Sequence, residues 1–478
     1  MNVLLIISDE HSREVAGCYG NPVVRTPNLD ALAACGTVFE NAYCNSPICV
    51  PSRASLATGD YVHRTGYWDS AAAYDGRVPS WHHRARDAGH DAVSIGKLHF
   101  RGADDDNGFS EVHHPIYVVD GVGDVHGLLR TEKRAREVAR GLAAEAGRGA
   151  SSYTRFDMKV ADATVRWIRE RASRSDGRPW VLFSSLLSPH YPLTAPGEFY
   201  DLYAHVDVPP PRLYRKAERP DHPVIAHYRE TWNYDDFFDA ERLEAGLKGY
   251  YGLCSFLDFQ IGRILAALDD SGFADDTLVI YTSDHGESLG NRGLWGKAVM
   301  YEESSGVPLL ISGPGISAGT RCSTPVSLVD VYPTVVESVC GELDARERAL
   351  PGRSLVALAR EQSPDRAVFS EMHDDGSMTG EFMLRQGVWK LVHYVGYPPQ
   401  LFDLSTDPFE ENDLAGRPEI RDVQDRLYGQ LRQIVDPEAI NRRVFADQRA
   451  RIEKLGGVEA VLSREDFNFT PVPDEPPQ

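Results

Sequence analysis

The sequence lacks paired cysteines and long hydrophobic runs. Its seven cysteines are scattered, and no two form a Cys-x-x-Cys pair, so neither a disulfide framework nor a zinc knuckle is indicated. No uncharged apolar run approaches the roughly 18 residues of a membrane-spanning helix, so we expect no membrane partner. The apolar stretch Val3–Ile7 is short, and no basic region precedes it. We therefore expect no signal peptide and a reducing, cytoplasmic location.

Basic residues are too few to balance the acidic ones. The 478 residues include 50 Lys and Arg against 71 Asp and Glu, which gives a net charge of −21. This charge argues against nucleic acid as a partner, because phosphate groups would be repelled. An anionic substrate would be repelled at long range as well. It would therefore have to be bound by a local cluster of cations.

Short apolar segments alternate with helical stretches over residues 1–365. The clearest of these segments are Val3–Ile7, Ala92–Ile95, Trp180–Leu187, Thr277–Thr282 and Val307–Ile311. The alternation predicts an α/β domain whose large mixed, mostly parallel sheet is sandwiched by helices. One such helix is predicted over Leu29–Cys35, with Thr26 as its N-cap and Gly36 as its stop. The Pro- and Tyr-rich segment Ala204–Phe238 shows no clean periodicity and is predicted to be irregular.

A different pattern begins near residue 366. Four short segments predict an antiparallel sheet, and they are Ala367–Glu371, Phe382–Arg385, Trp389–Tyr394 and Gln400–Asp403. A helix is predicted over Ile420–Val435, so residues 366–440 form a smaller C-terminal subdomain. Residues 441–478 are predicted to be an extension that ends in a Pro- and acid-rich tail.

Residues able to bind metals or anions directly follow four of the apolar segments. They are Asp9 and Glu10, Lys97 and His99, His190, and Asp284 and His285. In open α/β sheets, ligands bind outside the carboxyl ends of the strands. We therefore expect these side chains to meet in one site.

The segment Cys49-Val50-Pro51-Ser52-Arg53 combines a nucleophile with a cation. Pro51 suits the first turn of a helix and Gly59 suits its end, which places Cys49 at an N-terminus that favours anions. Arg53 lies four residues further on, on the same helix face. This arrangement suits attack on a sulfate or phosphate ester. The alternative is a small buried cysteine at the start of a helix, which is common.

The same segment, with Thr58-Gly59 after it, resembles the signature of type I sulfatases of the alkaline phosphatase superfamily. Further segments resemble that family in the same order, up to about residue 415. They are Asp9 after the first strand, Gly96-Lys97-Leu98-His99, Ser188-Pro189-His190-Tyr191-Pro192, Thr282-Ser283-Asp284-His285-Gly286-Glu287, Gly293-Leu294-Trp295-Gly296-Lys297, Gly387-Val388-Trp389-Lys390-Leu391 and Leu401–Pro408. The resemblance implies an alkaline-phosphatase-like fold and hydrolysis of a sulfuric ester.

The resemblance also implies that a dedicated formylglycine-generating enzyme oxidises Cys49 to formylglycine (3-oxoalanine). The hydrated aldehyde carries two hydroxyls. One can attack sulfur and expel the alcohol, and the other, once deprotonated, can expel sulfate and restore the aldehyde. A plain serine would instead leave a stable covalent sulfate ester.

One divalent cation is implied, held by Asp9, Asp284, His285 and formylglycine 49, with Glu10 as a further or outer ligand. Carboxylate oxygens favour hard ions such as Ca²⁺, whereas the imidazole shifts the preference towards Mn²⁺, so both ions stay open. The implied cation cluster consists of Arg53, Lys97, His99, His190 and Lys297. Within it, Arg53, Lys97, His190 and Lys297 would bind sulfate, His190 and Lys297 would also protonate or stabilise the leaving oxygen, and His99 would assist the release of sulfate.

Three functions are compatible with these residues. The first is a sulfatase acting on a small-molecule or carbohydrate sulfate ester, and the second is a phosphonate monoester or phosphodiester hydrolase with the same nucleophile. The third is a non-catalytic binding homologue in which Cys49 stays unmodified. The Asp284-His285-Gly286-Glu287 element resembles the branch of choline sulfatases and phosphonate monoester hydrolases. Choline is not supported, because His113–Gly127 offers only Tyr117 for an aromatic cage.

The tail, residues 464–478, has two interpretations. It is too polar and proline-rich to form a core element, which is typical of disorder. Alternatively, it crosses to a neighbouring subunit of a homo-oligomer and helps to wall that subunit's active site, anchored by Phe467 and Phe469.

Overall fold

A computed structural model describes residues 1–130, 136, 138–174, 177–374, 376–465 and 469–473. Its largest feature is an eight-stranded sheet in the order β11-β2-β10-β9-β1-β7-β4-β5. The strands are β1 (Asn2–Asp9), β2 (Thr37–Phe39), β4 (Asp91–Lys97), β5 (Glu111–Ile116), β7 (Trp180–Pro189), β9 (Thr277–Ser283), β10 (Leu309–Ser312) and β11 (Thr320–Cys322). Strand β1 runs parallel to both of its neighbours, β7 and β9, whereas β10 is antiparallel to β9 and β2. The predicted mixed, mostly parallel sheet is confirmed.

Strand β1 shows why this sheet needs helices on both faces. All eight of its residues are buried, and its side chains alternate between two hydrophobic cores. Val3, Leu5 and Ile7 belong to one core, and Leu4 and Ile6 belong to the other. A strand that is apolar on both faces can be kept from water only between two helical layers.

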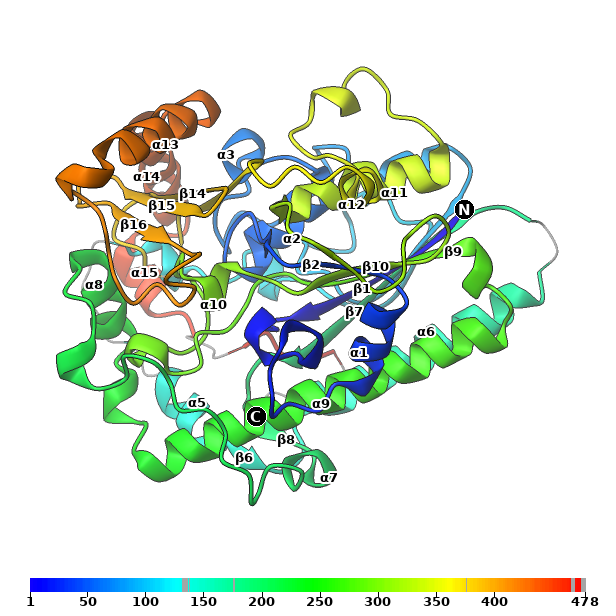
Figure 1. Cartoon of the computed structure of the whole chain (residues 1–478), viewed down its shortest axis with the longest axis horizontal. Coiled ribbons are helices and arrows are strands. Elements are labelled where there is room, and N and C mark those ends of the chain that lie inside the picture. Colours follow the sequence, from blue (N-terminus) through cyan, green and yellow to red (C-terminus); the bar gives the residue numbers. More distant parts are fainter. Residues whose placement is uncertain (131–135, 137, 175–176, 375, 466–468, 474–478) are drawn as a thin grey trace.

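The two helical layers lie above and below the sheet in Figure 1. One layer contains α1 (Pro27–Ala34), α6 (Ser152–Ala172) and α9 (Ala240–Asp270). The other contains α2 (Cys49–Thr58), α4 (Trp81–Asp87), α11 (Val331–Cys340) and α12 (Leu355–Arg360). The smaller elements around the sheet are β3 (Ala42–Tyr43), β6 (Gly147–Arg148), β8 (Thr194–Ala195), β12 (Val326–Ser327), α3 (Val62–Thr65), α5 (Val138–Glu145), α7 (Gly197–Tyr200) and α10 (Glu302–Ser305).

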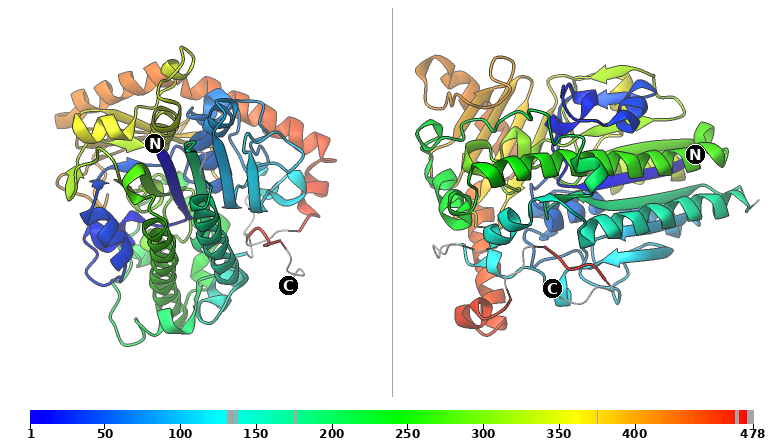
Figure 2. Two further views of the ribbon diagram at one scale, coloured as in Figure 1. Left: turned by 90° about the vertical axis from the view of Figure 1, so that its right-hand side faces the viewer. Right: turned by 90° about the horizontal axis from the view of Figure 1, so that it is seen from below.

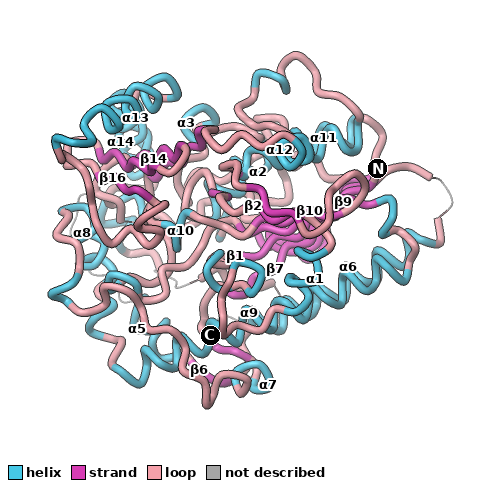
Figure 3. The backbone as a smooth tube through the Cα atoms, in the orientation of Figure 1, coloured by secondary structure: helices cyan, strands magenta, loops and turns pink. Residues whose placement is uncertain are grey.

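A second, antiparallel sheet follows in sequence, in the order β13-β14-β15-β16. Its strands are β13 (Ala367–Met372), β14 (Glu381–Gln386), β15 (Trp389–Tyr394) and β16 (Gln400–Asp403). Helix α13 (Arg421–Ile434) buries Leu427 and Leu431 in the same core as the small sheet. Figure 3 shows this sheet as a unit separate from the central one. The predicted C-terminal sheet and helix are therefore confirmed.

Two local predictions differ from the structure. Thr26 occupies the N-cap position of α1 but makes no capping hydrogen bond. The Asp258 carboxylate on α9 accepts hydrogen bonds from the Asn28 and Leu29 backbones instead, so tertiary structure supplies the cap. The segment predicted to be irregular contains a regular helix, α8 (Pro223–Trp232), whose buried face packs in two neighbouring cores.

The C-terminal extension is largely helical over its described residues. Helix α14 (Pro437–Lys454) spans the predicted boundary at residue 440, and α15 (Val458–Leu462) follows it. The proposed limits of the three domains remain a prediction. Within the described part of the chain, no helix is both long and apolar enough to cross a bilayer.

Candidate active site

The polar residues predicted to meet do follow neighbouring strands. Asp9 ends β1, and Asp284 and His285 come directly after β9, which pairs with β1 through Ser8 and Ser283. His190 follows β7 on the other side of β1, and Lys97 ends β4. Because these four strands are parallel, their carboxyl ends lie along the same edge of the sheet.

The backbone at two of these strand ends is turned sharply. Glu10 and His99 adopt positive φ angles of 68° and 54°, a conformation that is unfavourable for side chains larger than glycine. Gly96, with φ 103°, precedes Lys97. A Cβ at this position would lie 2.1 Å from the Ser185 carbonyl oxygen, so the close pairing of β4 with β7 requires glycine here.

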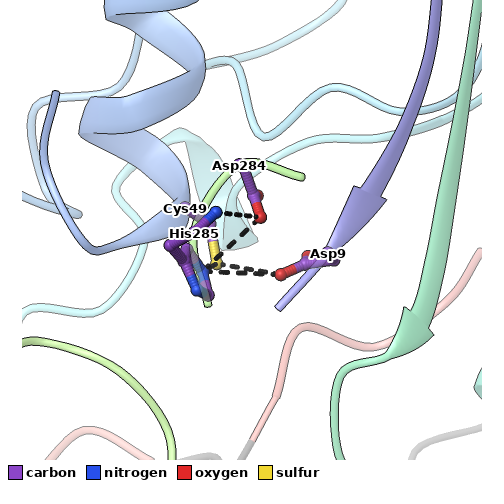
Figure 4. A group of neighbouring side chains, drawn as sticks. All are labelled: Asp9, Cys49, Asp284 and His285. Carbon is purple, nitrogen blue, oxygen red and sulfur yellow. Dashed lines mark hydrogen bonds and ion pairs between the residues drawn. The ribbon is translucent and has the colours of Figure 1, made fainter. Parts of the chain in front are cut away.

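Cys49 is the first residue of α2, as predicted, and Gly59 ends the helix in the left-handed conformation. Its Sγ lies 3.1 Å from His285 Nε2, 3.5 Å from Asp9 Oδ1 and 3.4 Å from Lys297 Nζ. Figure 4 shows Cys49, Asp9, Asp284 and His285 pointing towards one another from α2, β1 and the loop after β9. Burial, assisted by Asp9, raises the pKa of the Cys49 thiol to about 12.

These four residues form a set that can bind a metal ion. One potential ligand atom from each lies within 4.8 Å of the others, and all four side chains are buried. Asp284 Oδ1 accepts hydrogen bonds from the backbones of Glu10 and His285, which fixes its orientation. His285 Nδ1 is 3.0 Å from the Gly286 carbonyl oxygen, so its Nε2 is left facing Cys49. Two carboxylates, an imidazole and an oxygen from modified residue 49 would suit one hard divalent cation.

Arg53 and Lys97 neutralise the two carboxylates. The Arg53 guanidinium donates to Asp284 Oδ2 at 2.7 Å and to the Lys97 carbonyl at 2.9 Å, while Lys97 Nζ forms an ion pair with Asp9. Burial favours the neutral form of Asp9, but Lys97, His190 and Arg53 outweigh it and hold its pKa well below the ordinary value. Lys97 lines the cavity described below, whereas Arg53 is not among the described residues on its wall. Arg53 thus contacts the carboxylates, and its predicted contact with sulfate stays a prediction.

Glu10, His190 and Lys297 form a neighbouring group. Lys297 Nζ lies 2.7 Å from His190 Nε2, and His190 Nδ1 lies 2.6 Å from the Tyr191 carbonyl oxygen. Nδ1 therefore donates, and Nε2 accepts from Lys297. Glu10 Oε2 is 3.3 Å from His190 and 3.6 Å from Lys297, and Glu10 forms a second group of possible metal ligands with Asp9 and His190. Glu10 thus lies beside the four-residue set, and its role as a further or outer ligand stays a prediction.

The loop that carries Lys297 is fixed by Glu287, to which the sequence analysis assigned no role. Its Oε1 accepts hydrogen bonds from the Leu289 and Gly296 backbones, each at 2.7 Å. These bonds close the loop immediately before Lys297. The carboxylate within the predicted Asp-His-Gly-Glu element was the only sequence signal for this function.

A cavity of about 90 Å³ opens onto Cys49. Lys97, His99, His190 and Lys297 line it, which brings four of the five predicted cations to one space. The rest of its wall includes Phe469, which was predicted to anchor a tail beside an active site, and residues that were not predicted from the sequence: Asp124, Arg136, Tyr153, Trp232 and Thr470. These residues come from helices and loops distant in sequence, where no motif marks them. The aromatic residues on the wall, Tyr153, Tyr191, Trp232 and Phe469, lie outside His113–Gly127, the segment from which a choline cage was judged in the sequence.

Two family models match the chain. The Sulfatase model covers residues 1–341, and the model of the N-sulphoglucosamine sulphohydrolase C-terminal region covers residues 290–436. A choline-sulfatase from Rhizobium meliloti (strain 1021) is 32% identical over 425 residues, which are 87% of this chain and 83% of that protein. An arylsulfatase K from Danio rerio is 33% identical over 468 residues, or 93% of this chain and 85% of that protein.

Solved structures share the fold. A protein in complex with its substrate D-glucosamine-2-N,6-O-disulfate superposes with a TM-score of 0.72 at 21% identity, covering 93% of this chain and 98% of its own. The phosphonate monoester hydrolase of Agrobacterium radiobacter superposes with a TM-score of 0.70 at 25% identity, covering 91% and 95%. The matched family model, the similarity over most of the chain and the clustered residues lead to one conclusion: the chain belongs to the sulfatase family and is a sulfuric ester hydrolase.

Proposed function

We propose that this sulfatase hydrolyses a carbohydrate sulfate monoester, with formylglycine at position 49 as its nucleophile. The observation that carries the proposal is the position of Cys49. It lies at the N-terminus of α2, in one group with Asp9, Asp284 and His285, and its Sγ is 3.4 Å from Lys297 Nζ. We further propose that a formylglycine-generating enzyme modifies Cys49, and that the protein is a cytoplasmic homo-oligomer.

The proposed reaction begins with binding of the sulfate group. Lys97 and Lys297 supply the local positive charge that the acidic protein as a whole lacks, and the neutral His190 adds a polar contact beside Lys297. A divalent cation held by Asp9, Asp284, His285 and residue 49, with Ca²⁺ and Mn²⁺ both compatible, would polarise sulfate and favour ionised oxygen at residue 49. Arg53 and the backbone amides of Glu10 and His285 keep the Asp284 carboxylate in place.

One hydroxyl of hydrated formylglycine 49 attacks sulfur, the bond from sulfur to the ester oxygen breaks, and the alcohol departs. Lys297 and His190 are hydrogen-bonded to each other on the Cys49 side of the cavity, so they can deliver a proton to the leaving oxygen. Loss of the proton from the second hydroxyl then restores the aldehyde and releases sulfate. His99, which also lines the cavity, is the proposed base for this step.

We expect the tryptic peptide of residues 26–53 to be lighter than its coded mass by about one water, because sulfur is lost and a carbonyl oxygen gained. The measurement is peptide mass spectrometry on the sample used for kinetics. Coexpression with the formylglycine-generating enzyme should raise the modified fraction and the turnover in proportion. Fully active enzyme with an unmodified thiol would contradict the proposal.

The phosphonate monoester hydrolase remains the second candidate, because its structure superposes on this chain over most of its length. Sulfate and phosphonate groups are both tetrahedral, so their oxygens can contact the same cationic side chains. The rate on an aryl sulfate should exceed the rate on the matching aryl phosphonate ester. The opposite order would assign the chain to phosphonate hydrolysis with the same nucleophile.

Two charged residues on the cavity wall favour a sugar over choline. Arg136 forms an ion pair with Asp124 at 3.0 Å, and its guanidinium lies over the Trp232 ring at 4.8 Å. The pair offers donors and acceptors suited to sugar hydroxyls, next to an aromatic face. A quaternary ammonium would meet the positive charge of Arg136. The aromatic side chains present here therefore do not amount to a choline cage.

Arg136→Gln should lower kcat/KM for a monosaccharide sulfate by roughly tenfold or more, because polar groups that bind a substrate hydroxyl discriminate strongly. Activity on an aryl sulfate, which has no such hydroxyls, should change only a few-fold. Steady-state kinetics on both substrates and on choline sulfate provide the measurement. Equal losses on the sugar and aryl esters would remove Arg136 from substrate recognition, and a wild-type preference for choline sulfate would refute the choice of sugar.

A further inference from the structure

A short C-terminal segment, residues 469–472, packs against the active site of its own chain. We call it the strap. The Phe469 ring contacts Tyr153 edge-on at 4.9 Å, and the Tyr153 hydroxyl donates to the Thr470 carbonyl at 2.9 Å. Val472 is only 6% exposed and belongs to the core that α6 shares with the central sheet. The strap is therefore anchored at both ends of its described length, near the start of α6 (Figure 2).

The strap reaches two residues of the catalytic cluster. Thr470 Oγ1 lies 3.0 Å from His99 Nε2, although 371 positions separate the two in sequence. Tyr153, which holds Phe469 and Thr470, also contacts the His190 ring at 5.6 Å between centroids. Thr470 is thus placed to set the orientation of the His99 ring, and Phe469 lies one contact away from His190.

Phe469 and Thr470 also form part of the cavity wall in front of Cys49. At about 90 Å³, this cavity is small for a sulfate group together with a bulky alcohol, so the side chains on its wall limit what can enter. The strap lies beyond both segments matched by the family models, which end at residues 341 and 436. The contribution of the strap to the cavity wall therefore lies outside both matched segments.

One of the two tail interpretations made from the sequence, disorder, does not hold for residues 469–473, because they pack against their own chain. The crossing of the tail to a neighbouring subunit stays a prediction. The predicted anchor Phe467 lies outside the described residues. Phe469, the other predicted anchor, does pack against an active site, but in the same chain.

We propose that the strap determines specificity. Phe469 limits the size of the leaving alcohol, and Thr470 is a positioning residue that orients His99 through its hydroxyl. The kinetic consequences of this proposal rest on the sulfatase function proposed above. The barrier that Phe469 presents to Cys49 does not depend on that function, so the two can be tested separately.

The size limit is tested with Phe469→Ala on two sulfate esters, ethyl sulfate and 4-methylumbelliferyl sulfate. The ratio of kcat/KM for the bulky ester to that for the small one should rise roughly tenfold, the scale of a lost pocket contact. Phe259→Ala, which removes a 51% exposed phenylalanine on α9, is the matched control and should leave the ratio unchanged. An unchanged ratio in Phe469→Ala would overturn the size limit.

The positioning role is tested with Thr470→Val, which keeps the shape of the side chain and removes its hydroxyl. Release of sulfate is common to all esters, so kcat should fall several-fold on both substrates while KM changes little. Thr470→Ser should restore kcat, because it returns the hydroxyl. Wild-type kcat in Thr470→Val, or failure of the serine variant to recover, would overturn this role.

A third measurement needs no turnover. Protein made without the maturation enzyme keeps its thiols, and one tryptic peptide, residues 26–53, carries exposed Cys35, buried Cys44 and buried Cys49. Fragmentation of this peptide locates alkylation by iodoacetamide and by the larger N-ethylmaleimide. Phe469→Ala should raise maleimide labelling of Cys49 about tenfold, with Cys35 labelled as before and Cys44 still protected. An unchanged Cys49 labelling rate would refute the barrier even if the matured enzyme is an active sulfatase. A raised labelling rate, together with no activity on sulfate esters in the matured protein that carries formylglycine, would leave the barrier standing and reject the proposed function.

Discussion

Asp284→Asn is expected to remove the bound divalent cation and to lower kcat/KM by about a thousandfold. The Asp284 carboxylate is fully buried and lies with Asp9, Cys49 and His285 in the four-residue set. An amide of the same shape lacks the negative charge that a hard cation prefers. Loss of a metal ion removes several kcal/mol of charge stabilisation in the transition state, which corresponds to about three factors of ten.

Metal content measured by elemental analysis, alongside kinetics, is the direct test. Asp284 Oδ2 accepts from Arg53 and Oδ1 accepts from the Glu10 and His285 backbones, so the single amide oxygen of the variant can keep only one of these two sets, and circular dichroism must accompany the assay to verify the fold. Asp258→Asn provides a matched control, because Asp258 is a buried carboxylate that caps α1 away from the site. This control should lose stability but keep its metal and turnover. Full metal occupancy with normal activity in Asp284→Asn would reject the assignment.

Lys297→Ala and His190→Ala are expected to lower kcat/KM on alkyl sulfates by roughly a hundred- to a thousandfold, the usual range for loss of a general acid. Lys297 Nζ and His190 Nε2 lie 2.7 Å apart, and both side chains line the cavity in front of Cys49. An alkoxide leaves poorly without a proton, whereas an activated aryl oxide needs much less help. On an aryl sulfate, each variant should therefore lose less than about tenfold.

A series of esters with leaving groups of graded acidity measures this difference. The variants should show a steeper dependence of log kcat/KM on leaving-group acidity than the wild type. Lys248→Ala is the control, since it removes another largely buried lysine. Lys248 lies on α9, and its Nζ donates to the Ala204 carbonyl. Equal losses across the series would assign Lys297 and His190 to sulfate binding alone.

Prediction from the sequence succeeded where the residue pattern of a segment specifies the structure of that same segment. Each apolar run from Val3–Ile7 to Thr277–Thr282 became a strand, and the polar residue after it reached the common edge. This succeeds because a buried parallel strand must be apolar on both faces, and its carboxyl end is where the chain next meets solvent. The start of α2 at Cys49 was likewise marked by its own residues, Pro51 and Gly59.

The sequence could not identify a partner that lies far away in the chain. Helical spacing placed Arg53 on the face of Cys49 but could not show that Asp284 would bind its guanidinium. Glu10 was grouped with the metal ligands because it follows Asp9, and the sequence did not show that it would also lie beside His190 and Lys297. A hydrophobic period or a motif specifies on which face of a helix or strand a side chain lies. The residue that this side chain contacts depends on how elements distant in sequence pack together.

The family, the α/β architecture and the nucleophile segment follow from the amino-acid sequence, because these depend on local hydrophobic patterns and on motifs in a fixed order. Which residues wall the cavity depends on tertiary packing. Arg136, Tyr153 and Trp232 meet there from three separate segments, and none of the three carries a local signal of that position. The contact between Thr470 and His99 forms only when the C-terminal segment folds back onto the sheet. Such contacts are made by packing between elements far apart in the chain, and local patterns do not encode them.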